Sequence, residues 1–71
     1  MRSPRISGMD LVKMLCSQGF VVVRQKGSHI RLEKNTPEKT IKLTVPNHPE
    51  LKKGTLHHIL KAASLHLEDL L

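Results

Sequence analysis

The stretch VVVRQKGSHIRLEK, residues 21–34, decides the fold because it contains two strand-like halves around a glycine turn. Its first half is rich in β-branched residues, which is typical of a strand. Gly27 supplies the dihedral angles that a tight turn needs. The second half alternates, so that Ile30 and Leu32 face one way and His29 faces the other way. The pattern predicts a β-hairpin that points His29 away from the core, among cations.

The segments on both sides of the hairpin predict an α-β-β-β-α order. Ser7 and Asp10 match a capping box at the start of a helix, and Gly19 suits the end of that helix because glycine accepts a positive φ. The remaining predicted elements are a strand over 40–46, a helix over 54–64, and a final helical turn that packs Leu65, Leu67 and Leu70. Three strands joined by short turns predict an antiparallel sheet, and both helices are expected on its apolar face. The expected fold class is α+β.

Apolar residues at regular spacing identify the expected core. They are Leu11, Val12, Leu15 and Cys16 in the first helix, Ile41, Leu43 and Val45 in the third strand, and Leu56, Ile59, Leu60 and Ala63 in the second helix. The alternation in the third strand turns Lys42 and Thr44 outward, to the same side as His29.

The length of 71 residues predicts a single domain over residues 1–71, with residues 1–6 expected to be frayed. Cys16 is the only cysteine, which excludes an intramolecular disulfide and a zinc site built on cysteines. A lone thiol suits a reducing cytoplasm. No apolar run approaches the roughly 20 residues of a membrane span, and no signal peptide is recognised. We therefore expect a cytoplasmic protein without a membrane partner.

The net charge is +6, from 12 Lys and Arg residues against 6 Asp and Glu residues. Eight of the 12 basic residues lie between positions 24 and 53, and this concentration predicts a nucleic-acid partner. The alternative is a charge excess that only aids solubility. Phe20 is the only aromatic residue, so the chain cannot stack successive bases on an aromatic platform. Recognition must use phosphates, ribose or shape.

Histidine titrates near pH 7, as general acid–base catalysis requires, and the chain has five histidines. His29 is either a catalyst or a simple hydrogen-bonding residue, and the residue pattern alone favours neither. His57 and His58 are adjacent, so they diverge by about 100° on a helix and suit a metal poorly. No metal and no cofactor are expected.

The segments SGMDLVKMLCSQGFVVVRQKGSHIRL and TVPNHPELKKGTLHHILKAASL resemble the HicA-type (YcfA-like) toxins of type II toxin–antitoxin systems. The resemblance runs from about Ser7 to the end of the chain. Its marks are Gly19-Phe20, Arg24, Gly27-Ser28-His29, Pro46 with His48, and Lys53-Gly54-Thr55 leading into Ile59, Leu60 and Lys61. One departure is Ser64, which stands where many members have a glycine and is less comfortable at positive φ.

The resemblance implies a fold like that of double-stranded-RNA-binding domains and the activity of an mRNA interferase, a small ribonuclease that cleaves messenger RNA. The Gly-Ser-His motif maps the catalytic role onto His29. The residues expected to bind RNA are Arg24, Lys26, Gly27, Ser28, Arg31 and Lys42, and His48 is a candidate for an accessory acid or base. The implied partner is a HicB-type antitoxin that covers His29 in a hetero-oligomeric complex. The alternative is a non-catalytic module that binds duplex RNA by its shape.

Overall fold

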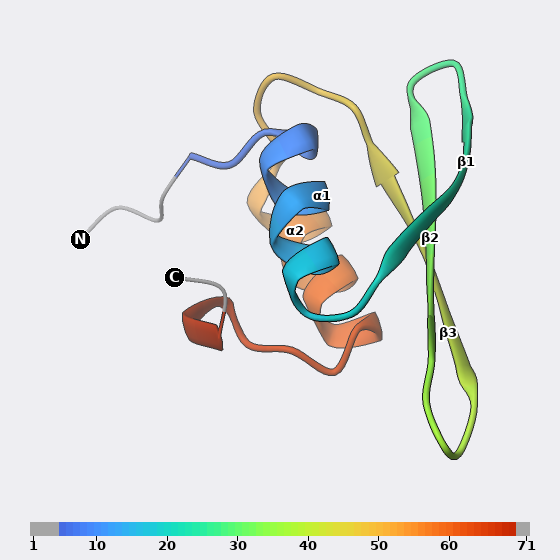
Figure 1. The fold of residues 1–71 in the computed structure, drawn as a ribbon. Coiled ribbons are helices and arrows are strands. Elements are labelled where there is room, and N and C mark those ends of the chain that lie inside the picture. The colour runs from blue at the N-terminus through green and yellow to red at the C-terminus, as the bar shows by residue number, and fades with distance from the viewer. Residues whose placement is uncertain (1–4, 70–71) are drawn as a thin grey trace.

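The computed structural model describes residues 5–69 and confirms the α-β-β-β-α order. The elements are α1 (Gly8–Ser17), β1 (Val21–Lys26), β2 (His29–Asn35), β3 (Thr40–Pro46), α2 (Lys53–Ala62) and the short 3₁₀ helix η1 (Leu67–Asp69). The strands form one antiparallel sheet in the order β1-β2-β3. Figure 1 shows α1 and α2 on the same side of this sheet, as expected. The opposite face is left uncovered by the described part of the chain.

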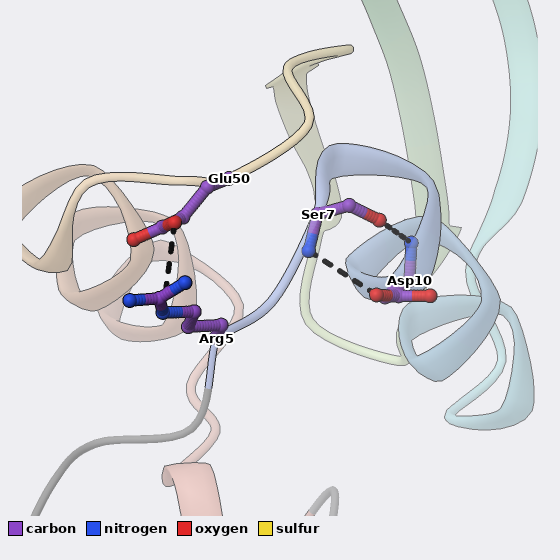
Figure 2. A network of polar contacts seen from close by, with 4 residues as sticks. All are labelled: Arg5, Ser7, Asp10 and Glu50. Carbon is purple, nitrogen blue, oxygen red and sulfur yellow. Dashed lines mark hydrogen bonds and ion pairs between the residues drawn. The ribbon is translucent and has the colours of Figure 1, made fainter.

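The start of α1 is fixed by the predicted capping box (Figure 2). The Asp10 backbone N–H donates to the Ser7 hydroxyl at 3.0 Å, and the Ser7 backbone N–H donates to the Asp10 carboxylate at 3.2 Å. Two contacts hold the pKa of Asp10 below its usual value. The hydrogen bond from the Ser7 backbone N–H has the larger effect, and the hydrogen bond with the Ser7 hydroxyl has a smaller one. Arg5 and Glu50 form an exposed ion pair nearby at 3.8 Å, which contributes little stability.

The chain is packed from Ile6 onward. Ile6 is buried in the core, and its carbonyl accepts a hydrogen bond of 2.8 Å from the Leu51 N–H. Ile6 is therefore not frayed, contrary to the expectation for residues 1–6. Residues 1–4 lie outside the described range, as does Leu70 of the expected final turn. Leu65 and Leu67 of that turn pack against the core as half-buried residues.

Both helices end in a Schellman motif, with a left-handed residue just after the cap. In α1 this residue is Gly19, at φ 99°, and the Phe20 N–H bonds back to the Leu15 carbonyl at 3.1 Å. In α2 it is Ser64, at φ 59°. The predicted end of α1 is confirmed, and Ser64 does occupy the conformation that its side chain disfavours.

The core lies between the helices and one face of the sheet. The predicted apolar faces of β2, β3 and α2 are buried, except that Ile41 is half-buried. The expectation for Cys16 is wrong, because Cys16 is exposed. The core at this end of α1 is occupied by the Phe20 ring, which is 2% exposed. At the other end of α1, Gly8 is buried against the sheet instead. Neither helix among the described residues has the length and apolar character needed to cross a membrane.

Candidate functional site

The β1–β2 turn places His29 at the start of β2. Gly27 and Ser28 alone connect the two strands, and Gly27 supplies a φ of 59°. Ser28 keeps a negative φ, which is the φ signature of a type II′ hairpin turn. Lys26 and His29 are therefore cross-strand partners, and Pro46 pairs with His29 from the other side. The predicted turn at Gly27 is confirmed, and Gln25 and Lys26 belong to β1.

A β-bulge in β1 decides which side chains accompany His29. Val22 pairs with Leu32 and Arg24 pairs with Arg31, so Val23 is an extra residue in β1. Strict alternation from Val22 would turn Arg24 toward the core side of the sheet. The extra residue turns the Arg24 side chain outward again. Bulges beside functional sites often redirect a side chain in this way. Lys26, two residues further on, faces outward for the same reason.

These outward side chains meet in one open depression of about 480 Å³ on the uncovered face of the sheet. Its lining residues are Arg24, Lys26, His29, Arg31 and Thr44. All of them are exposed, and no carboxylate lines the depression. Three cations around one histidine attract a polyanion and oppose the binding of another cation. The site therefore has the chemistry to hold a phosphate group beside an imidazole.

Gly27 and Ser28 border this depression through the turn that precedes His29. A Cβ added to Gly27 would meet nothing within 4 Å, so an approaching ligand can reach its backbone. The Ser28 carbonyl accepts a hydrogen bond of 2.6 Å from the Asn47 N–H, which ties the turn to the loop after β3. The structure therefore brings the Gly-Ser-His motif together with three of the cations predicted to bind RNA.

Two predicted site residues lie apart from this cluster. Lys42 is on the same face of the sheet but pairs with Glu33, further along the strands, and does not line the depression. His48 is exposed beyond the end of β3, and its carbonyl accepts the Gly8 N–H at 2.9 Å. It too is absent from the lining of the depression.

Thr44 is the lining residue that the sequence analysis did not name as a site residue. It stands opposite Arg31 on β3. The predicted outward phase of β3 already contained the signal for it, since Thr44 and His29 belong to the same face. Within residues 5–69, no three His, Cys, Asp or Glu side chains gather in a way that could hold a metal ion.

A match to a known protein family covers most of this chain. A family model described as the HicA toxin of bacterial toxin–antitoxin systems matches residues 8–65, which is most of the chain. No curated protein and no solved structure matched. The matched range contains every residue that lines the depression. The chain therefore belongs to the HicA toxin family.

Proposed function

We propose that this toxin is a metal-independent endoribonuclease, an mRNA interferase, in which His29 is the catalytic residue. The observation that carries the proposal is the single depression that places His29 among Arg24, Lys26 and Arg31. The resemblance of the Gly-Ser-His motif to that of mRNA interferases supports the same assignment. Because the proposed substrate is messenger RNA, we place the activity in the cytoplasm.

The three cations bind the phosphate that is to be cleaved. Arg24 and Arg31 pair directly across the strands, so two guanidinium groups approach the same region of the outer face. Guanidinium groups suit phosphate oxygens because they present parallel N–H donors. They also stabilise the negative charge that develops on the phosphate in the transition state, which is usually the largest catalytic effect.

His29 then acts on the attacking 2′-hydroxyl of the RNA. Neutral imidazole accepts the 2′-OH proton while the 2′-oxygen bonds to the adjacent phosphorus. The bond from phosphorus to the 5′-oxygen breaks, and that oxygen takes up a proton. The products are a 2′,3′-cyclic phosphate and a 5′-hydroxyl end, and no metal or cofactor takes part. A single acid–base group contributes roughly 10²–10⁴-fold, so we expect slow turnover.

Protonation of the leaving oxygen requires a second donor. Lys26 is better placed for this role than His48, because Lys26 faces His29 across the strands and lines the depression. His48 lies beyond the end of β3 and does not line it. We therefore assign the second transfer to Lys26 or to a water molecule beside it, with Gly27 and Ser28 positioning the RNA backbone.

The test is incubation of purified protein with messenger RNA in excess EDTA. The wild type should cut the RNA and leave 2′,3′-cyclic phosphate ends, whereas His29→Ala should bind RNA without cutting it. His58→Ala is the matched control, because His58 is an exposed histidine on α2 that lines no part of the depression. Cutting by His29→Ala at the wild-type rate would overturn the assignment, and so would a strict need for a divalent metal. RNA binding without cleavage by the wild type would favour the duplex-binding alternative.

Membership of the family implies an antitoxin partner. We propose that this partner is a HicB-type antitoxin, that it covers His29 in a hetero-oligomeric complex, and that its acidic side chains meet the cations of the depression. Covering the site is sufficient for inhibition, because no conformational change is then needed. Cleavage should stop when the antitoxin reaches the stoichiometry of the complex. Continued cleavage by a saturated complex would contradict this model of inhibition.

A further inference from the structure

The outer strand β1 has an apolar segment that the fold does not bury. Val21, Val22 and Val23 are 61%, 43% and 50% exposed, and every residue of β1 is exposed. We refer to Val21–Val23 as the valine edge. Among residues 5–69 only β2 pairs with β1, so the other edge of this strand has no strand partner. The strand order makes β1 an edge strand, and Figure 1 shows that it follows directly from the end of α1.

Exposed apolar edge strands are uncommon because they invite association with another chain. The opposite edge of this sheet is protected in the usual way: β3 carries Lys42 and Thr44 as exposed residues and ends at Pro46. The valine edge lacks such residues over three consecutive positions. Exposed apolar surface of this kind commonly marks an interaction site.

The residues that follow the valine edge indicate the chemistry of its occupant. Arg24 continues the same strand and Lys26 follows it, so the strip changes from apolar to cationic within β1. RNA could use the cations, but aliphatic valines offer it neither stacking nor hydrogen bonds. A second copy of this chain would add another net charge of +6. In an antiparallel pairing it would set the cationic end of one β1 against the valines of the other, and in a parallel pairing it would set cations against cations. A protein segment that is first apolar and then acidic complements both halves of the strip.

We propose that the valine edge is a docking site for an extended segment of the antitoxin, with apolar side chains against Val21–Val23 and acidic side chains against Arg24, Lys26 and Arg31. The apolar half supplies affinity, since removal of apolar surface from water is the main favourable term in most protein–protein association. The acidic half fixes the direction of the segment and carries it across the depression that contains His29. The inhibitory consequence rests on the proposed function, but the docking itself does not.

The test uses the double variant Val21→Thr/Val23→Thr. Threonine is also β-branched, so the strand should persist, while each new hydroxyl would lose its water in the complex. The probe is the HicB-type antitoxin, purified from co-expression and titrated calorimetrically into the toxin. Binding is measured on a His29→Ala background, so the result does not depend on catalysis. The dissociation constant should rise on the order of tenfold or more, and the Val21→Thr/Val23→Thr protein with His29 intact should cut RNA as the wild type does.

Met9→Gln is the control, because Met9 is 44% exposed on α1, outside the valine edge. This variant should bind the antitoxin as the wild type does. An unchanged dissociation constant for the double valine variant would overturn the proposal. So would self-association of the wild type that the double variant abolishes, since the valine edge would then join two copies of the toxin. Loss of RNA cleavage in the double variant would also count against it, since the valines would then serve the RNA site.

Discussion

Gly8 at the start of α1 lies directly against the carbonyl group of Pro46 at the end of β3. A Cβ added to Gly8 would clash with the Pro46 carbonyl oxygen and lie 2.9 Å from the Cα of Asn47. Pro46 is the cross-strand partner of His29, and the Asn47 N–H holds the Ser28 carbonyl at 2.6 Å. The absence of one side chain on α1 therefore lets the helix support the loop beside the Gly-Ser-His motif.

Replacement of Gly8 by alanine should destabilise the protein by about 1–3 kcal/mol, the usual cost of forcing an extra carbon into a packed site. The free energy of unfolding is measured by urea titration. Gly54→Ala is the matched control: Gly54 lies in the first turn of α2, and a Cβ there meets nothing within 4 Å. Alanine at Gly54 should raise stability, by up to about 1 kcal/mol. Equal effects of the two substitutions would contradict the packing argument.

The capping box of α1 should make stability depend on pH. The pKa of Asp10 is lowered from its usual value of 3.8, so its contact with Ser7 stabilises the fold above that value. The contribution should disappear as the pH falls through the lower pKa of the folded state. Asp10→Asn should cost stability at pH 7, because the amide lacks the charge that these bonds favour, and this cost should shrink below pH 3.8. Unfolding by urea at several pH values measures the difference.

Ser17→Ala is the control for this pH dependence. The Ser17 hydroxyl donates to the Met14 carbonyl at 2.6 Å in the last turn of α1 and contacts no carboxylate. The cost of removing it should therefore be the same at pH 3 and pH 7. An Asp10→Asn cost that also stays constant over this range would show that Asp10 does not gain stability from the cap.

Binding of RNA should depend strongly on salt, because the site offers cations and no aromatic platform. On single strands the slope of log K against log salt is about 0.7 per phosphate neutralised. Lys26→Ala and Arg31→Ala should each reduce that slope by about 0.7. Affinity is measured on a His29→Ala background, so that the RNA stays intact. Lys13→Ala removes an equal charge from α1, outside the depression, and should leave the slope unchanged.

The two halves of the hairpin show how far the sequence predicts this site. In β2, alternation alone placed Ile30 and Leu32 inward and His29 outward, because a strand that covers a core carries that period in its residues. In β1 there is no such period. Val22 and Val23 are chemically equivalent, so the sequence cannot tell which residue is the extra one in the bulge. The outward direction of Arg24 follows from this bulge, and only the structure supplies it.

The helix faces show a similar limit. Cys16 satisfies the helical spacing of the apolar face, yet it is exposed, because the buried ring of Phe20 follows the helix and fills the core there. Gly8 has no side chain to contribute to an apolar pattern, yet its burial fixes how closely α1 approaches Pro46. Spacing predicts which side of a helix is apolar. How deeply each end of the helix is buried depends on which part of the core the neighbouring segments leave unfilled.

Ser64 after α2 and Gly19 after α1 occupy equivalent positions, so they allow the stability of the two helix ends to be compared directly. The Leu65 N–H bonds to the Leu60 carbonyl at 2.9 Å, and the Ser64 N–H bonds to the Lys61 carbonyl at 3.1 Å, which completes the Schellman motif of α2. Gly19 occupies the equivalent position after α1. A residue with a Cβ pays about 1–2 kcal/mol in the left-handed region, and Ser64 is at φ 59°.

Ser64→Gly should therefore raise the free energy of unfolding by about 1 kcal/mol, since the relief of strain exceeds the entropy that glycine adds to the unfolded chain. Thermal and urea unfolding measure this gain. Gly19→Ser is the reciprocal variant. It should lower stability, because a Cβ there takes on the strain of φ 99° and meets only the flexible end of Lys34, at 3.3 Å. Ser64 and Gly19 lie outside the depression, so RNA cleavage per folded molecule should not change in either variant. A Ser64→Gly protein no more stable than the wild type would show that the motif tolerates serine without strain.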